Sequence, residues 1–395
     1  MTALKTKPEA QAELLPSLTQ KSERNMGVEL FRIVSMLLVI LLHVMGHGGV
    51  YTYADPLSTN YTVAWFLETV GYCSVNCYAI ISGFANVKTK FKFRRFIHLW
   101  LETVVLILAM TAIAHFFIPS LEVQREWWRS AIFPMSTREL WYICAYFLLF
   151  PLMPLLNKGL HAISRWQHVV IILWLQVPTV VKLIMHKDSF GVSGGYSTIW
   201  LISLYVIGAY FRMYGAPKWA KWFVTLPSFL LCALAAWFKM IYIEKQEALG
   251  LVEKDSVLYQ FRDDLISYVS PLMVIMSVML LLFFMQLQIK GKPIKWLIAN
   301  FAKATWGVFV IHVCSAGWYW DELWHSFRKF ADYPTWKMVL CSLGAVAAIY
   351  LVTSLFTLGK IYLFKLLRID KGIELLADLC AKWIKKGSKQ PSEPS

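Results

Sequence analysis

The chain has 395 residues, of which 58% are hydrophobic and only 16% are charged, with 18 Trp and 18 Tyr. This composition excludes an ordinary soluble globular domain and predicts a protein that crosses a membrane several times. The net charge of +15 does not indicate nucleic-acid binding, because a membrane protein collects Lys and Arg in its cytoplasmic loops.

The N-terminal segment, residues 1–25, is polar, and we expect it to form a disordered cytoplasmic tail. The apolar run that follows is long enough to span a bilayer, carries ionisable residues and lacks a small-residue cleavage site after it. These features predict a signal anchor with its N-terminus inside rather than a cleaved signal peptide.

Ten apolar runs can each supply the roughly 20 residues that a spanning helix needs. They cover residues 27–49, 61–86, 96–118, 139–156, 168–186, 197–213, 221–243, 265–288, 301–318 and 337–364. With the N-terminus inside, about two thirds of the 39 Lys and Arg residues fall on the cytoplasmic side. The sequence therefore predicts an all-α integral membrane protein of about ten transmembrane helices, with the N-terminus and C-terminus cytoplasmic and a membrane domain over residues 26–367.

The C-terminal segment, residues 368–395, combines an amphipathic stretch with a polar end. Its apolar positions share one helical face and its lysines occupy the rest, which predicts a cytoplasmic helix lying on the membrane surface, followed by a disordered tail. The apolar face comprises Ile369, Ile373, Leu376, Leu379, Cys380 and Trp383.

Ionisable residues in the first apolar run form a stripe. Arg32 and His43 are eleven residues apart, so in an α-helix they lie within about 20° of one another and about 16 Å apart along the axis. Glu29 and His47 lie near the same line. Because a charge facing lipid is costly, we expect this stripe to face a protein-lined or water-filled cavity.

Each member of the stripe also has a simpler interpretation. Arg32 alone is compatible with a snorkelling anchor, and His43 alone with a hydrogen-bonded packing residue. The i, i+4 spacing of His43 and His47 is that of a helical metal pair, but no third ligand is evident, so we predict no metal site. A cation and a base on one stripe, at opposite depths, favour a functional site.

The same residues resemble the signature of the integral-membrane acyltransferase family 3, in which an arginine and a histidine are separated by ten residues in the first span. Glu29 fits the acidic position that precedes this arginine. Ser74–Phe84 resembles the family's second-span segment, except that Asn76 stands where many members have Asp. This departure puts an acid role at that position in doubt.

Three further segments extend the resemblance, which covers about residues 25–365. The basic loop "KTKFKFRRF", the Trp-led helix with two prolines at Glu139–Asn157 and the late helix Ala304–His312 follow in the family's order. The ending "HVMGHGG" is most similar to Gram-positive cell-surface polysaccharide acetyltransferases.

The resemblance implies a membrane O-acyltransferase of a bacterial cell (plasma) membrane. It would move an acyl group from acetyl-CoA, or another acyl-CoA, to a hydroxyl of an extracytoplasmic envelope polysaccharide or its lipid-linked precursor. The expected partners are the lipid bilayer, the acyl-CoA and the glycan acceptor. Because the chain carries no fused esterase-like domain, we expect direct transfer or hand-over to a separate extracytoplasmic acyl-acceptor protein.

Two histidines are the catalytic candidates. His43 is suited to take the proton of a sugar hydroxyl near neutral pH, and an acyl-imidazole intermediate is the alternative role. His312 lies well along the ninth run, which has the same direction as the first, so the two histidines can approach one another. The alternative for His312 is a packing residue.

The remaining candidates bind substrates. We expect phosphate and the coenzyme arm to be bound by basic residues near the cytoplasmic side, because arginine can hold phosphate through two hydrogen bonds. The cofactor-binding candidates are Arg32, Glu29, Arg94 and Arg95, and the acceptor-binding candidates are His47, Trp141 and Tyr142. Trp141 and Tyr142 fall near the outer boundary, where interface anchors are also common.

A transporter or flippase for an envelope glycan or a small solute is the alternative function, because several spans with intramembrane charge can also line a pathway. No repeat between the two halves is visible, and the stripe matches an acyltransferase pattern. Glu29, one turn from Arg32, is its expected partner, and Glu102, in the third run, is a second candidate counter-ion.

Overall fold

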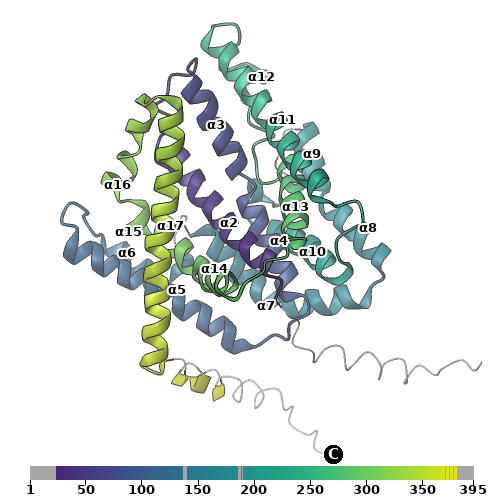
Figure 1. The fold of residues 1–395 in the computed structure, drawn as a ribbon, viewed down its shortest axis with the longest axis vertical. Helices are drawn as coiled ribbons and strands as arrows, with labels where there is room; N and C mark the ends of the chain where they lie inside the picture. The colour runs from purple at the N-terminus through teal and green to yellow at the C-terminus, as the bar shows by residue number, and fades with distance from the viewer. Residues whose placement is uncertain are drawn as a thin grey trace, which may run out of the picture.

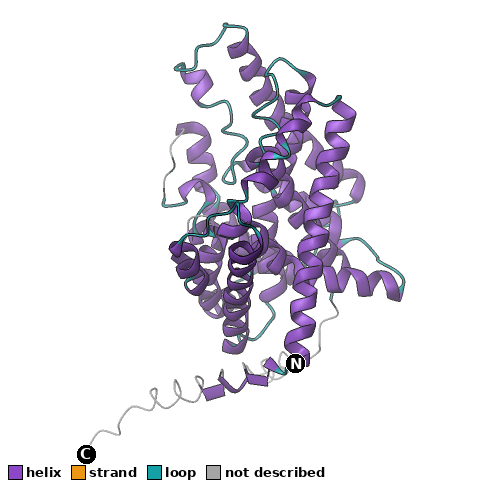
Figure 2. Cartoon of the chain, turned by 90° about the vertical axis from the view of Figure 1, so that its left-hand side faces the viewer, coloured by secondary structure: helices purple, strands orange, loops and turns teal. Residues whose placement is uncertain are grey.

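The computed structural model describes residues 24–136, 140–185, 188, 190–369, 371–372, 374–376 and 378–379. The described residues form helices joined by loops and turns, with no strand among them (Figure 2). The expected all-α class is therefore confirmed for this part of the chain. Residues 1–23 of the predicted N-terminal tail and the end of the amphipathic C-terminal segment lie outside the described residues, whereas Asn25 caps the first helix.

The helices follow one another along the chain with short connections. They are α2 (Met26–Leu42), η2 (His43–His47), α3 (Thr59–Gly71), α4 (Ser74–Asn86), α5 (Phe93–Phe117), α6 (Arg125–Ile132), η3 (Pro134–Ser136), α7 (Trp141–Ala162), α8 (Arg165–Leu175), α9 (Val177–Met185), η4 (Ser193–Gly195), α10 (Thr198–Tyr214), α11 (Trp222–Ala248), α12 (Val257–Gln260), α13 (Pro271–Met285), α14 (Lys292–Val313), α15 (Ser315–Trp318), α16 (Asp321–His325), η5 (Arg328–Asp332) and α17 (Thr335–Leu366).

Seven helical segments among the described residues are long and apolar enough to cross a bilayer. They are Met26–His47, Phe93–Phe117, Trp141–Ala162, Arg165–Met185, Trp222–Ala248, Lys292–Val313 and Thr335–Leu366. The predicted second run is instead divided between α3 and α4, and α10 and α13 have only 17 and 15 residues. A multi-pass membrane protein is thus supported, while ten spans and the orientation of the termini stay predictions.

Helix α2 lies in the middle of the bundle, where it contacts α3, α4, α13, α14 and α17 (Figure 1). Asn25 begins the helix: its side-chain oxygen accepts a hydrogen bond from the Val28 amide, and its Nδ2 donates to the Met285 carbonyl at the end of α13. Such a cap satisfies an amide that the helix itself leaves unpaired. Phe31 and Phe284 stack with ring centroids 5.1 Å apart. The first helix is therefore anchored to α13.

Small residues allow α4 and α10 to approach closely. A Cβ atom at Gly83 would collide with the Tyr205 carbonyl, and one at Gly208 would collide with the Ile80 carbonyl. This reciprocal contact is typical of helices packed inside membranes. The buried Asn76 joins the same region, because its Nδ2 donates to the Tyr268 carbonyl and its oxygen accepts from Trp200 Nε1. Asn76 therefore has a structural role.

One buried ion pair joins α5 to α17. Lys360 Nζ lies 2.5 Å from Glu102 Oε1, and both side chains are largely buried. The hypothesis that Glu102 neutralises Arg32 is wrong, because Lys360 occupies this carboxylate and Arg32 lies 3.8 Å from Glu29 instead. Glu29 can contact Arg32 because residues three apart on one helix are neighbours.

Breaking the Lys360–Glu102 pair should destabilise the fold, because the remaining charge would be buried without a partner. We expect Lys360→Met or Glu102→Leu each to cost about 3 kcal/mol, and the double variant to recover most of this loss. Thermal unfolding of the purified protein in detergent, followed by tryptophan fluorescence, measures the effect. Additive losses in the double variant would contradict a direct pair.

Candidate active site

A large cavity of about 1590 Å³ follows the first helix from one end to the other. The predicted stripe of α2 and η2 faces this cavity, as expected from the cost of exposing ionisable side chains to lipid. The stripe residues that line it are Glu29, Arg32, Met36, Val39, His43, Gly46 and His47.

The end of the cavity near the start of α2 is strongly basic, and we call it the basic end. It is lined by Arg24, Lys88, Lys90, Lys92, Arg95 and Lys303. Arg94 does not line the cavity; its Nη1 lies 2.5 Å from Glu374 Oε1 on the exposed surface. The structure therefore brings Arg95 to the cavity and leaves Arg94 outside it.

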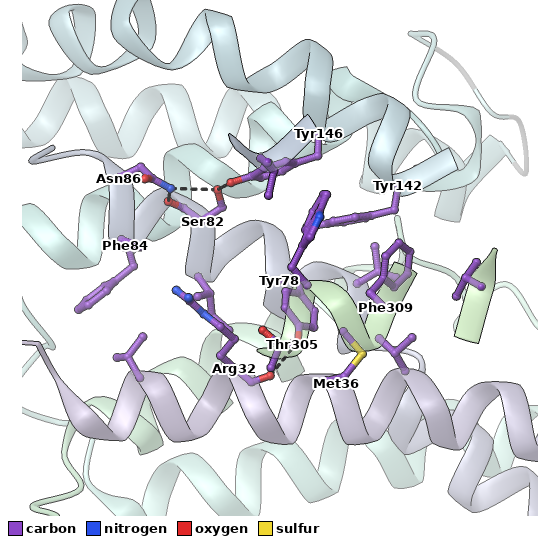
Figure 3. A pocket seen from close by; sticks show the side chains of 18 of the residues that line it. Arg32, Met36, Tyr78, Ser82, Phe84, Asn86, Tyr142, Tyr146, Thr305 and Phe309 are labelled. Carbon is purple, nitrogen blue, oxygen red and sulfur yellow. Dashed lines mark hydrogen bonds between the residues drawn. The ribbon is translucent and has the colours of Figure 1, made fainter. Parts of the chain in front are cut away.

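Arg32 occupies the middle of the cavity, between the basic end and the histidines. Figure 3 shows its side chain extending from α2 into the cavity. In this view Tyr142 and Tyr146 lie above, across the cavity from α2, and Tyr78 lies between them and α2. The Tyr78 hydroxyl donates to the Arg32 carbonyl at 2.9 Å. Tyr142 is buried in this wall, so its ring does not lie on the outer surface of the bundle as that of an interface anchor would.

His43 lines the other end of the cavity, which we call the histidine end, and His312 lies against His43 without itself lining the cavity. The rings of His43 and His312 have centroids 5.1 Å apart. His43 begins the π-helical turn η2, in which the Gly48 amide donates to the His43 carbonyl at 2.7 Å. Single π-turns inside α-helices are frequent at functional sites. The approach of the two histidines, inferred from the parallel direction of their spans, is confirmed.

Hydrogen bonding fixes one nitrogen of His312 and leaves the other free. His312 Nδ1 lies 2.6 Å from the Val308 carbonyl, which can only accept, so Nδ1 carries the proton. In the neutral ring Nε2 then has the lone pair, and this buried atom has no hydrogen-bond partner among the described residues. His43 Nδ1 is likewise buried without one. Unpaired buried nitrogens are uncommon, which marks the pair as a place where a substrate could complete the contacts.

His47 is held by an aromatic wall. Its ring stacks on Trp318 at 3.9 Å, and its Nε2 donates to the Trp318 carbonyl at 2.9 Å. Trp318 also places its ring 4.9 Å from His43, nearly perpendicular to it. The chain leaves α14 at Cys314 in an extended conformation, and the short helix α15 returns Trp318 to the site.

Sequence reasoning did not assign Trp318 or Glu68 to the site, yet both line the cavity. A boundary tryptophan is usually an anchor, and nothing local shows that α15 folds back. Glu68 could have been noticed from the sequence, because it is an acid inside an apolar run. Among the described residues, no group of three or more His, Cys, Asp or Glu could hold a metal ion.

A protein-family model described as an acyltransferase domain, Acyl_transf_3, matches residues 25–357. The chain belongs to the acyltransferase 3 family. The match contains every cavity-lining residue except Arg24, so the cavity of this membrane acyltransferase lies almost wholly within the family domain. No curated protein and no solved structure matches the chain.

A thiol introduced into the cavity should be accessible to water-soluble reagents. Ser82 lines the cavity, whereas the equally small Ser35 on α2 is fully buried outside its wall. In a cysteine-free background, we expect Ser82→Cys to react with a charged methanethiosulfonate at least about tenfold faster than Ser35→Cys, since access controls thiol reactivity. Equal rates would contradict a solvated cavity along α2.

Proposed function

We propose that this membrane acyltransferase moves an acyl group, acetyl in the first instance, from acyl-CoA to a hydroxyl of an envelope polysaccharide or its lipid-linked precursor. The observation that carries the proposal is the continuous cavity that joins the basic end to His43, whose ring contacts that of His312. A donor with phosphates at one end and a thioester at the other matches this polarity.

The basic end would bind the phosphates of the donor. Arginine and lysine side chains bind phosphate through charge-assisted hydrogen bonds, and arginine can form two at once. Arg95 fits this role, whereas Arg94 is paired with Glu374 and does not enter the proposal. This end would face the cytoplasm, where acyl-CoA is made.

Arg32 would guide the donor arm toward the histidines. It precedes His43 by eleven residues, a rise of about 16 Å along a helix, which is comparable to the reach of a pantetheine chain. Glu29, 3.8 Å from Arg32, would orient its guanidinium. A long arm could thus keep its phosphates at the basic end while its thioester lies beside His43.

At the histidine end, imidazole would act as the base. A free nitrogen of His43 accepts the proton of the acceptor hydroxyl as the hydroxyl oxygen attacks the thioester carbonyl. The carbon–sulfur bond then breaks, and the departing sulfur takes the proton back from the imidazolium. The alternative route transfers the acyl group first to His43 and then to the hydroxyl.

His312 does not line the cavity, but its ring lies 5.1 Å from that of His43, so it would position the His43 ring. Its Nδ1 is fixed on Val308, so its orientation does not depend on a substrate. In the neutral ring, Nε2 carries the lone pair and would stabilise the imidazolium that forms on His43. His47, Trp141 and Tyr142 line the same cavity and remain our candidates for acceptor contacts.

The proposed setting is a bacterial plasma membrane, with the bilayer, acyl-CoA and an envelope glycan as partners. The acceptor could be the glycan itself or a separate extracytoplasmic protein that receives the acyl group. A transporter or flippase would use the same cavity as a pathway, but the family membership and the paired histidines favour acyl transfer.

Replacing His43 should abolish transfer without loss of the fold. In inside-out vesicles supplied with radiolabelled acetyl-CoA and an envelope fraction, we expect His43→Ala to label the glycan at least about a hundredfold more slowly than wild type, because the base is lost. The control is His161→Ala, which removes an exposed histidine outside the cavity. Wild-type rates in His43→Ala protein of unchanged melting temperature would contradict the role.

Replacing Arg32 should weaken donor binding. We expect Arg32→Gln to raise the Kd of coenzyme A about tenfold, since a hydrogen-bonded charge contact is lost, and to leave the melting temperature nearly unchanged. Isothermal titration calorimetry of the purified protein measures this, with the exposed Arg125→Gln on α6 as a control for charge. Equal losses of affinity and stability would instead indicate that Arg32 is structural.

A further inference from the structure

Glu68 on α3 is a buried acid in the cavity wall. Its side chain belongs to a residue that is only 6% exposed, and its Oε2 has no hydrogen-bond partner among the described residues. None of the described Lys or Arg side chains forms an ion pair with it. A buried acid without partners is costly, so the fold alone does not account for this residue.

A second acid shows how a structural carboxylate looks in this protein. Glu244 on α11 is also 6% exposed, but Arg262 pairs with its Oε1 and the Tyr61 hydroxyl donates to its Oε2. Both oxygens are therefore satisfied. Glu244 does not line the cavity, whereas Glu68 does.

Glu68 lies at the histidine end. A Cβ atom at Gly46 would be 3.4 Å from Glu68 Oε1 and 3.4 Å from the Tyr51 hydroxyl. Gly46 follows His43 by three residues, which places the two on neighbouring turns of the same helix. A group bound to Glu68 would thus be next to the proposed base.

Aromatic rings line the cavity beside this acid, and we call them the tyrosine wall; its three tyrosines are close enough to Glu68 to interact with it electrostatically. The wall consists of Tyr72, Trp141, Tyr196 and Tyr268, all of which line the cavity. The Trp141 and Tyr196 centroids are 4.5 Å apart, and Tyr268 lies 5.2 Å from Tyr196 and 5.3 Å from Tyr72.

The tyrosine wall is held by the helices behind it. Asn76 binds the Tyr268 carbonyl, and a Cβ atom at Gly195 would press against the Tyr268 side chain, so this part of the wall is tightly packed. In contrast, Tyr196 is 51% exposed and reaches the open rim. Rigid aromatic faces with one free hydrogen-bond acceptor make a site that is apolar over most of its area and polar at one point.

We propose that Glu68 and the tyrosine wall form the acceptor-sugar subsite of this acyltransferase. The ligand class is a neutral or N-acetylated pyranose: its apolar face packs on the wall, and one ring hydroxyl forms a hydrogen bond with the Glu68 carboxyl group. This contact holds a neighbouring hydroxyl toward His43. That this sugar is the acyl acceptor rests on the proposed function, but sugar binding itself can be measured without acyl transfer.

Direct binding tests the subsite in the full-length protein without acyl-CoA. Methyl pyranosides of glucose, galactose, N-acetylglucosamine and N-acetylmannosamine serve as probes, and quenching of tryptophan fluorescence reports binding. For the tightest probe, we expect Glu68→Gln to raise Kd about tenfold and Glu68→Leu to raise it further, since the amide keeps only part of the hydrogen bonding of the carboxyl group and leucine keeps none.

Matched variants separate binding from folding. Tyr196→Leu should weaken sugar binding by roughly threefold to tenfold through the loss of an aromatic face. The control Tyr242→Leu, at a similarly exposed tyrosine outside the cavity, should leave sugar binding unchanged. Glu68→Gln should leave the melting temperature and the coenzyme A Kd unchanged. Glu244→Gln should lower the melting temperature and leave the sugar Kd unchanged.

The subsite would be overturned if the wild type bound no pyranoside, or if both Glu68 variants bound the sugar with wild-type affinity. A parallel loss of sugar binding, coenzyme A binding and thermal stability would also overturn it, because Glu68 would then be structural. Glu68-dependent sugar binding without any acetyl transfer by the wild type would refute the proposed function and leave the sugar site standing.

Discussion

The structure depends on the cost of placing charged and polar side chains in a membrane. The first helix carries an acid, an arginine and two histidines, and it can do so because a cavity runs beside it and other helices surround it. Lys360 and Glu102 show the other solution, a buried pair between two helices. The described part of the fold therefore accommodates intramembrane charges in at least two ways, and those along α2 line the cavity.

The cavity is polar in different ways at its two ends. Cations gather near the start of α2, whereas imidazoles with unpaired nitrogens lie near its end. Electrostatic binding of phosphate at one end and proton transfer at the other can then occur on one long substrate without interfering. Glu68 and the tyrosine wall extend this logic to the acceptor, because they place a hydrogen-bond acceptor next to the turn that carries His43.

Helical periodicity explains what the sequence could predict. Arg32, Met36, Val39 and His43 share a face by spacing alone, and that face lines the cavity. Tertiary contacts decided the rest: the break between α3 and α4, the pairing of Arg94 with Glu374 and the return of Trp318 through α15 all depend on partners far along the chain. Glu68 could be noticed as an acid in an apolar run, but its lack of a partner is visible only when its neighbours are placed.

The central claim is that one cavity brings a donor from one face of the membrane to an acceptor on the other. Purified protein in liposomes, with radiolabelled acetyl-CoA only on the side of the basic end and a glycan acceptor only on the opposite side, tests it directly. We predict label on the glycan while the liposomes remain sealed to acetyl-CoA. Transfer that occurs only when donor and acceptor share one side would contradict the claim.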